Sequence, residues 1–477
     1  MRSLVWFRGK DLRVADHAPL TAALEGEAIL LFVLDPYFFS AERATELPHR
    51  MQFLLQSLEA LKKNVEHLGG ELVIVSGRAV DVVPELAKRW RVDRVVAHRW
   101  VEPFGRARDA RVQEGLGSIP LELFEGETLL PPGSVRTGAG TPFSVFTPFA
   151  RAIARALHVE PPLPAPKRLP PLPADVRTKM VRIPTLADLD LSENPRVIVG
   201  GERAARERLD AFVTKAAKRY DEDRNRMDLP GTSRLSADLK FGTLSVRTVW
   251  VKAHKNAKTH PEPTRVFANE LLWREFAHHT LFDRPNLLER PFRADFEGFP
   301  WKPARGAAWD AWCTGHTGYP VVDAAARQLL GEGFVHNRAR MIAASFLAKH
   351  LLMDFRAGEA HYLKWLVDGD WAQNDAGWQW SAGCGCDAQP YFRVFAPVTQ
   401  GERFDPEGDY VRRWVPELAG LDAKYIHSPW TAPEPALAKA GVTLGKTYPR
   451  PIVDHATARN AFLAAAQRHL RAPATSS

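Results

Sequence analysis

The first 130 residues alternate short apolar runs with amphipathic stretches, and this alternation most restricts the fold. The apolar runs are Leu4–Phe7, Ala28–Leu34, Leu72–Val75, Val95–Ala97 and Leu121–Phe124. Between the second and third runs, residues 51–68 carry apolar side chains at helical spacing and are closed by Gly69-Gly70. A strand–helix–strand order predicts a parallel sheet covered by helices. We therefore expect an α/β domain over residues 1–130.

A proline-rich segment and then a helical pattern follow. Seven of the fourteen residues from Glu160 to Pro173 are proline, which excludes a helix interior or a central strand there. We expect a linker over residues 131–200, semi-rigid in its proline-rich part. Helical periodicity in Val321–Leu330 and Arg338–Leu352 then predicts a helical domain over residues 201–477.

Composition and charge limit the possible functions. Of the 477 residues, 25% are charged and 45% apolar, as in soluble globular proteins. No apolar run approaches the ~18 to 20 residues of a membrane span, and the amino terminus leads directly into a strand, without a signal-peptide pattern. The net charge of +8 favours a polyanionic partner such as DNA. We expect a cytoplasmic protein without membrane contact.

Neither the cysteines nor a standard phosphate-binding motif identifies a ligand or a site in this chain. Cys313, Cys384 and Cys386 are too few for a disulfide framework, and the Cys-Gly-Cys spacing does not match a zinc knuckle. We expect them to be small core residues in a reducing compartment, and we expect no metal site. The chain contains neither G-x-G-x-x-G nor a Walker loop, so no standard motif identifies a ligand.

Tryptophan is concentrated in the second half of the chain. Eleven of the fourteen tryptophans follow residue 240, and four lie within Trp365–Trp380. A single tryptophan is usually a core residue. This density beside polar groups instead predicts a π-rich site for a flavin, a nucleobase or an electron relay.

Four segments in this half are chemically unusual. Gly231–Ser236 offers hydroxyls and backbone N–H groups before a helix, which suits a phosphate or a plain helix cap. Asn269–Phe276 and His336–Met341 each place polar and apolar side chains on one helical face, for base recognition or for a surface ion pair. Asp368–Trp380 mixes acidic and amide groups with glycine and tryptophan, as expected around the edge of a ring system.

Over nearly its full length, the chain resembles the photolyase/cryptochrome family. The matching stretches are Trp6-Phe7-Arg8 followed by Asp11-Leu12-Arg13, Thr147-Pro148-Phe149, Thr232–Ser236, Glu270–Phe276, Gly318–Ala325, His336–Met341, Asp368–Trp380, Asp387–Arg393 and Phe404-Asp405. The resemblance implies a Rossmann-like α/β antenna domain with a parallel sheet, followed by an all-helical domain that binds FAD.

The resemblance also assigns roles residue by residue. It implies cofactor binding by Tyr220, Thr232, Ser233, Leu235, Ser236, Arg274, Arg340, Asp368, Asp370 and Asn374. Arg340 should pair with Asp368, and Asn374 should face flavin N5. A neutral amide at that position tolerates an anionic reduced flavin, whereas a carboxylate would favour a protonated ring.

The implied activity is light-driven repair of cyclobutane pyrimidine dimers in DNA by a monomeric carbon–carbon lyase that associates with the nucleoid when bound. The implied catalytic residues are Glu270, Trp273, Asn337, Met341 and Trp380, and the implied DNA-binding residues are Arg224, Arg338, Arg393 and Gln400. The alternatives are a cryptochrome photoreceptor with little repair activity and a photolyase for (6-4) photoproducts. The latter requires histidines as proton donors where this chain has Asn337 and Met341.

Two positions depart from the family pattern. The usual electron chain to the flavin would begin at Trp378 and end at Trp301, but its middle position is Phe355, which is far harder to oxidise. Trp365 and Trp371 are the expected substitutes. In the antenna domain, the run Pro103–Asp109 is more like that of members with a deazaflavin than that of members with methenyl-tetrahydrofolate. The second chromophore therefore stays open.

Overall fold

The computed structural model describes residues 1–471, which divide into two compact units. The first unit comprises Met1–Asp221, Thr232–Pro285 and Val367–Ala372. The second comprises Glu222–Gly231, Asn286–Leu366 and Gln373–Ser477. This division differs from the expected domains 1–130, 131–200 and 201–477, because residues far along the chain belong to the first unit. The expected domain boundaries stay predictions.

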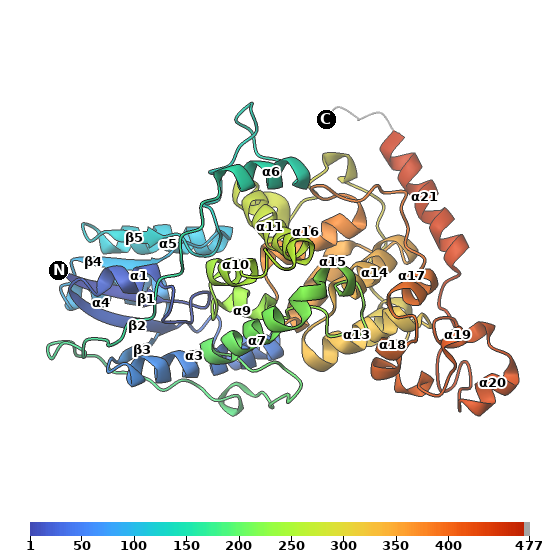
Figure 1. Cartoon of the computed structure of the whole chain (residues 1–477), viewed down its shortest axis with the longest axis horizontal. Coiled ribbons are helices and arrows are strands. Elements are labelled where there is room, and N and C mark those ends of the chain that lie inside the picture. The colour runs from blue at the N-terminus through green and yellow to red at the C-terminus, as the bar shows by residue number, and fades with distance from the viewer. Residues whose placement is uncertain (472–477) are drawn as a thin grey trace. The chain divides into compact units, whose positions relative to one another are not determined.

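Five parallel strands form one sheet in the first unit (Figure 1). They are β1 (Arg2–Phe7), β2 (Glu27–Leu34), β3 (Leu72–Ser76), β4 (Arg94–His98) and β5 (Leu121–Phe124), in the order β3-β2-β1-β4-β5. In the register of the central strand, Leu4 lies opposite Ile29 on one side and Val95 on the other. The five expected strands are therefore confirmed, with ends that differ by at most two residues.

Both faces of this sheet are buried, which explains the continuous apolar runs. Val5 and Phe7 of β1 belong to one apolar cluster, whereas Leu4 and Trp6 belong to another. Successive side chains of a strand point to opposite faces, so a sheet covered on both sides needs apolar residues at every position. Four helices both contribute to these clusters and contact the strands: α1 (Ala18–Ala23), α3 (Pro48–His67), α4 (Ala79–Arg89) and α5 (Pro103–Leu116).

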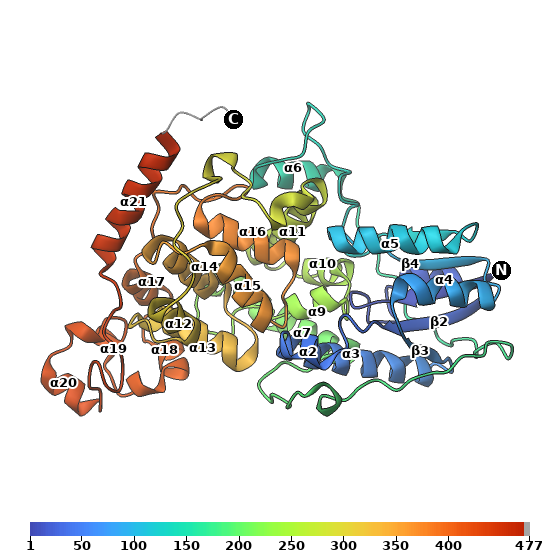
Figure 2. The same ribbon diagram turned by 180° about the vertical axis from the view of Figure 1, so that it is seen from behind.

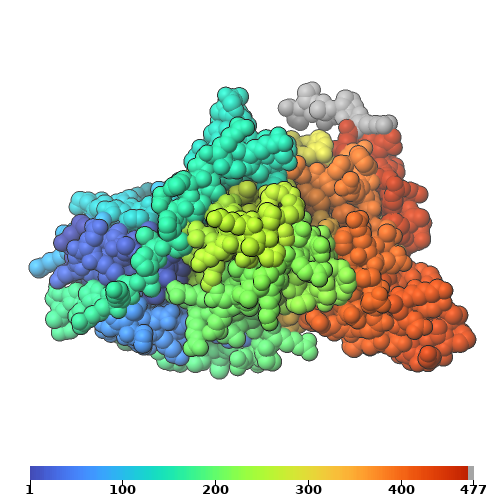
Figure 3. All heavy atoms as spheres, in the orientation of Figure 1, coloured from blue at the N-terminus to red at the C-terminus, as the bar shows by residue number. Residues whose placement is uncertain are grey.

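The remaining helices of the first unit include one inside the expected linker. They are α2 (Ala41–Thr45), α6 (Phe146–Ala156), α7 (Glu202–Thr214), α9 (Ser236–Phe241), α10 (Val246–His254) and α11 (Pro261–Asp283). Residues 131–200 were expected to connect domains, but they contain α6 and a short 3-10 turn at Ala187–Leu189. Pro148 lies in the first turn of α6, where a missing N–H breaks no helical hydrogen bond. In the space-filling view, the yellow-green surface belongs to the region of α10 and α11 (Figure 3).

The second unit is helical throughout its described residues. Its helices are α12 (Ala307–Thr314), α13 (Pro320–Glu332), α14 (Asn337–Ser345), α15 (Phe355–Trp365), α17 (Pro397–Phe404), α18 (Asp409–Trp414), α19 (Ala423–Ile426), α20 (Glu434–Lys439) and α21 (His455–Arg471). Helices α8 (Tyr220–Asp223) and α16 (Trp371–Ala382) begin in the first unit and end in the second. Helix α13 packs against α12, α14 and α15 (Figure 2). The expected helix Arg338–Leu352 is α14 continued by a π-helical turn, Phe346–His350.

The turn before α13 is held by a buried carboxylate. Asp323 accepts hydrogen bonds from the backbone N–H and hydroxyl of Thr317, at 2.7 and 2.6 Å, and from the backbone N–H of Gly318 at 3.1 Å. The hydroxyl of Tyr448 donates to the same carboxylate at 2.6 Å. Gly318 has a φ of +79°, and a Cβ there would lie 2.4 Å from the backbone carbonyl carbon of Arg450. Only glycine fits this position.

Among the described residues, no helix has the length and apolar character that crossing a bilayer requires.

We predict that Gly318→Ala strongly destabilises the protein. A positive φ and a backbone clash act together there, and overpacking of this kind costs about 1–3 kcal/mol or more. The matched control is Gly138→Ala, because Gly138 is exposed and a Cβ there would meet no atom within 4 Å. The midpoint of thermal unfolding should fall for Gly318→Ala alone. Equal midpoints for the two variants would contradict the prediction.

Candidate active site

Helix α11 carries one of the expected substrate-binding faces. Glu270, Trp273 and Arg274 lie on it and are half-buried. The Trp273 indole stacks on the Phe146 ring of α6, with ring centroids 3.8 Å apart and an angle of 7° between the ring planes. This stacking, with an edge contact from Phe276 at 5.9 Å, fixes the orientation of the indole. Arg274 donates a hydrogen bond to the backbone carbonyl of Glu127 at 2.7 Å, so at least part of its guanidinium has a structural role.

The segment Thr232–Ser236 turns into α9 and ends on the first residue of that helix. Arg234 has a φ of +52°, in the left-handed region. The cap position of α9 is Leu235, and no side chain caps the helix there, so a plain side-chain cap does not explain the hydroxyls. Ser233 Oγ accepts only a long hydrogen bond, 3.4 Å, from the Leu235 backbone N–H. These hydroxyls and amides suit the diphosphate of the FAD that the resemblance implies.

The turn Asp368–Asp370 joins a buried charge network that the sequence did not reveal. The Lys10 ammonium lies 2.7 Å from Glu102 Oε2 and 3.6 Å from Asp370 Oδ2, and it also pairs with Glu127. All four side chains are buried. Lys10 follows β1, Glu102 follows β4 and Glu127 follows β5, so the network joins three strand ends to the 367–372 segment. Spacing alone could not show it, because its members lie far apart in the sequence.

The electrostatics of this network keep it largely charged. Although burial alone would lower the pKa of Lys10, the three carboxylates raise it above its ordinary value. Burial would raise the pKa of Glu127, but Lys10 lowers it to about 2. Burial raises the pKa of Glu102. The neighbouring His278 is buried, and burial lowers its pKa to about 3, so its ring is neutral.

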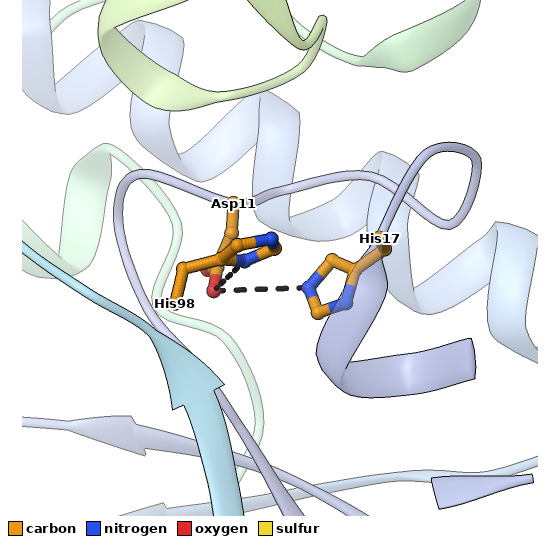
Figure 4. A group of neighbouring side chains, drawn as sticks. All are labelled: Asp11, His17 and His98. Atoms are coloured by element: carbon orange, nitrogen blue, oxygen red, sulfur yellow. Dashed lines mark hydrogen bonds and ion pairs between the residues drawn. The ribbon is translucent and has the colours of Figure 1, made fainter. Parts of the chain in front are cut away.

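Two groups of buried side chains resemble metal ligand sets. In the first, His98 Nδ1 and His17 Nε2 lie 3.3 and 3.7 Å from Asp11 Oδ2 (Figure 4). His17 Nδ1 accepts the backbone N–H of Leu20 at 3.1 Å, and burial lowers the pKa of the ring. The neutral ring therefore carries its proton on Nε2, which turns a donor rather than a lone pair toward Asp11. This group is a buried polar cluster in which His98 is within hydrogen-bond distance of Asp11 and His17 lies slightly farther away.

The second group consists of Glu127, His278 and Asp370, whose ligand atoms lie within 4.8 Å of one another. Its carboxylates already pair with the Lys10 ammonium. A metal ion there would place a second cation among the same oxygens. The geometry therefore favours an ion-pair network over a metal centre.

Helix α16 places Asn374 in the second unit. Its side-chain N–H donates to the backbone carbonyl of Glu359 at 3.0 Å, which fixes the orientation of the amide. Asn374 is buried, and its carbonyl oxygen accepts no hydrogen bond from another described residue. An acceptor held in this way suits the N–H of a reduced flavin ring, so Asn374 fits the expected cofactor. Nearby, burial raises the pKa of Glu359 and of Asp375, so this surrounding carries less negative charge than its composition suggests.

The first turn of α14 presents two of the expected catalytic residues. Asn337 is exposed, Met341 is half-buried, and the Asn337 side-chain N–H lies 3.8 Å from Met341 Sδ. The preceding His336 is buried and caps the helix, because its Nδ1 accepts the backbone N–H of Arg338 at 3.1 Å. Burial lowers the pKa of His336 to about 4. The structure therefore brings an amide and a thioether together and uses the adjacent imidazole as a neutral cap.

The expected DNA-binding residues lie in the second unit. Arg338 donates to Asn225 Oδ1 at 2.6 Å, and its guanidinium lies 4.4 Å from the centre of the Phe404 ring of α17. Gln400 is half-buried on the same helix, and Arg224 is half-buried beside Asn225. Arg338, Gln400 and the segment of Arg224 thus gather around α17.

Arg393 is exposed on the loop before α17, next to Phe392, whose side chain is also exposed. Buried Lys349 donates to the Arg393 backbone carbonyl at 3.0 Å and holds this loop in place. No role was expected for Phe392 itself, although it lies within a stretch that matches the family. Its exposure beside Arg393, which only the structure shows, points to a role in contact with a partner.

Of the expected electron route, Trp301 and Phe355 are in ring contact, and the route itself stays a prediction. The Trp301 and Phe355 rings lie 6.2 Å apart. Trp371, one expected substitute, contacts the Phe104 ring of α5 at 6.2 Å, whereas Trp365 is half-buried at the end of α15. Trp378 and Trp380 lie on α16, Trp378 buried and Trp380 half-buried.

The carboxyl ends of β1 and β4 are where a parallel sheet of this order receives a ligand. Here Arg8 binds Asp109 through two contacts of 2.9 and 3.0 Å, and its guanidinium lies 4.8 Å from the Trp6 ring centre. Arg108 lies 4.3 Å from the Trp100 ring centre. Ion pairs and cation–π contacts of the chain itself therefore lie at this edge of the sheet. A second chromophore stays a prediction.

Comparisons with known proteins agree with this geometry. The family model for DNA photolyase matches residues 3–167, and the model for the FAD binding domain of DNA photolyase matches residues 267–468. A deoxyribodipyrimidine photo-lyase from Agrobacterium fabrum is 42% identical over 473 residues, which cover 97% of each chain.

Solved structures give the same result. The crystal structure of a bacterial class III photolyase from Agrobacterium tumefaciens aligns with a TM-score of 0.90 at 40% identity and covers 98% of this chain and 97% of that one. A cryptochrome from Synechocystis aligns with a TM-score of 0.89 at 30% identity, covering 97% of this chain and 98% of its own. The chain therefore belongs to the DNA photolyase family, and residues 267–468 form its FAD-binding domain.

Proposed function

We propose that this chain repairs cyclobutane pyrimidine dimers in DNA in a light-dependent reaction. The observation that carries the proposal is the first turn of α14, where Asn337 is exposed one helical turn from Met341. An amide can hydrogen-bond the polar edge of a pyrimidine, and a thioether packs on its apolar ring. The relatives' shared name supports the same substrate.

The same turn argues against repair of (6-4) photoproducts. That chemistry needs an imidazole to deliver a proton to the lesion. The one histidine of this turn, His336, is buried as a helix cap with a lowered pKa, so it cannot present a proton donor at the surface.

When bound and reduced, FAD supplies a light-driven electron that splits the dimer and is then recovered. The residues of this chain place the lesion and keep water away from it. In our proposal Trp273 and Trp380 stack on the flipped pyrimidines, and Glu270 and Asn337 bind their polar edges. The residues proposed to hold FAD are Tyr220, Thr232, Ser233, Leu235, Ser236, Arg340, Asp368, Asp370 and Asn374.

A cryptochrome is the second candidate, because a cryptochrome structure aligns over nearly the whole chain. Photoreception and repair share this fold, and the substrate-contacting residues distinguish them. The complete set Glu270, Trp273, Asn337, Met341 and Trp380 favours repair.

The proposed partner is DNA, bound by a monomer. The exposed guanidinium of Arg393 and the net charge of +8 support contact with phosphates. Because its substrate is DNA, we place the enzyme where the chromosome is, which in a bacterium is the cytoplasm. Arg224, Arg338 and Gln400 would contact the same backbone.

We predict that the reduced, illuminated protein splits thymine dimers back to thymines and leaves (6-4) photoproducts intact. The substrates are two oligonucleotides with one lesion each, and restoration is read by chromatography against a dark control. Intact dimers after illumination would favour the cryptochrome alternative. Repair of the (6-4) lesion would contradict the role given to Asn337 and Met341.

We predict that Trp273→Ala weakens binding to dimer DNA by roughly tenfold or more, because stacking on one base is worth ~1–3 kcal/mol. The control is Trp250→Ala, which removes an indole that stacks on His254 at 4.4 Å in α10. The flavin absorption spectrum reports whether FAD is retained, and titration with labelled DNA reports affinity. If both variants bind equally, Trp273 has only a packing role.

We predict that Arg393→Ala lowers the slope of log K against log salt concentration by about one unit, because it removes one phosphate contact. Arg203→Ala removes the same charge from α7, where Arg203 is exposed and pairs with Glu207. Its slope should match that of the unmodified protein. An identical decrease in both variants would show that only net charge matters.

A further inference from the structure

A row of aromatic rings in the second unit connects buried Trp378 with the surface. The ring centroids of Trp378 and Trp312 are 6.0 Å apart, and their planes are inclined by 71°. Trp312 in turn stacks on Trp309, with centroids 5.5 Å apart and planes at 23°. Trp312 is buried, and Trp309 is half-buried on the same helix, α12. Three tryptophans thus lie in ring contact from the interior to the exterior.

This row of rings does not include Phe355, the position at which the chain departs from the family pattern. The expected exit passes through Phe355, whose ring contacts Trp301 at 6.2 Å. Phenylalanine is too hard to oxidise to serve as an intermediate site for electron hopping, that is, to hold an electron vacancy. Trp312 offers an indole in contact with Trp378, so a vacancy on Trp378 has an oxidisable neighbour without Phe355.

The Tyr362 ring also contacts both inner rings, at 5.2 Å from Trp378 and 6.0 Å from Trp312. It is nevertheless a poor intermediate site for electron hopping. A phenol that loses an electron must also release its proton. The Tyr362 hydroxyl is buried, has no hydrogen-bond partner among the described residues, and has a pKa raised by burial. No base is in place to take the proton, so the vacancy passes to indole instead.

Trp312 is suited to pass the vacancy on. Its indole N–H donates to the backbone carbonyl of Ala343 at 3.1 Å, and a carbonyl is too weak a base to remove that proton. The oxidised indole therefore stays a strong oxidant and takes an electron from the stacked Trp309. Trp309 is partly accessible, so water can stabilise a cation there.

We propose that Trp378, Trp312 and Trp309 form the route by which an external thiol reduces the bound flavin under light. This proposal rests on FAD being bound as in the family, with Trp378 as its first electron donor. Each photon moves one electron inward from Trp309 through Trp312 to Trp378 and the flavin. A thiol returns one electron to Trp309. After two such transfers, two thiols are joined as a disulfide; one of their protons completes the reduced flavin and the other goes to solvent.

The test compares four variants purified with oxidised FAD: Trp312→Phe, Trp309→Phe, Trp301→Phe and Trp365→Phe. Flavin reduction is followed under blue light with dithiothreitol, and the yield of the long-lived tryptophan radical is followed by transient absorption. Trp312→Phe and Trp309→Phe should lose about tenfold or more in both. Trp301→Phe and Trp365→Phe should stay near the unmodified protein. Trp309 is only half-buried, so its variant remains informative even if Trp312→Phe does not fold.

Two outcomes would overturn the route. One is a normal radical yield in Trp309→Phe. The other is loss of photoreduction in Trp301→Phe or Trp365→Phe alone. Dimer repair by chemically reduced protein is measured in parallel and should be unchanged in all four variants. If the unmodified reduced protein repaired no dimer, the proposed function would fail while the comparison of photoreduction rates would still stand.

Discussion

The first unit depends on one ammonium, that of Lys10, buried among Glu102, Glu127 and Asp370. A buried charge is tolerated only when it is paired, and removal of one partner from such a pair typically costs about 3–5 kcal/mol. Because Lys10 is the cation shared by three carboxylates, it fixes the ends of β1, β4 and β5 together. It also contacts Asp370, so the turn Asp368–Asp370, which is expected to serve the flavin, is tied to these strand ends.

This dependence explains why the sheet and the cofactor-binding turn belong to one compact unit, although more than two hundred residues separate them in the sequence. The Asp11 cluster adds to it. Two neutral imidazoles face one carboxylate, and Asp11 also accepts the backbone N–H of Arg8 at 2.6 Å. The loop after β1 is thereby held at both ends. Paired polar groups in a buried cluster favour one arrangement of a loop, whereas apolar contacts would allow several.

Sequence reasoning succeeded where local pattern decides the structure. The five strands could be placed because burial on both faces demands uninterrupted apolar runs, and α13 because its apolar spacing is regular. It failed where distant residues decide. Proline content concealed α6, and nothing near residues 367–372 indicates that they pack with Lys10. Motif resemblance identified Asn337 and Met341 but not the role of His336 as their helix cap. Trp309 and Trp312 were missed because their partner, Trp378, lies on a distant helix.

The surroundings of those tryptophans contrast with the Lys10 network. Around Trp312, burial lowers the pKa of His361 to about 4, raises that of Cys313 to about 12 and raises that of Tyr362. These groups are therefore neutral at physiological pH, and none of them presents a charge next to the buried indole. A fixed cation would oppose an electron vacancy there, and a fixed anion would hold it in place. Trp378 and Trp312 are buried, whereas Trp309 is half-buried, so water can stabilise a vacancy only at Trp309. An external electron donor therefore meets the row of rings at Trp309.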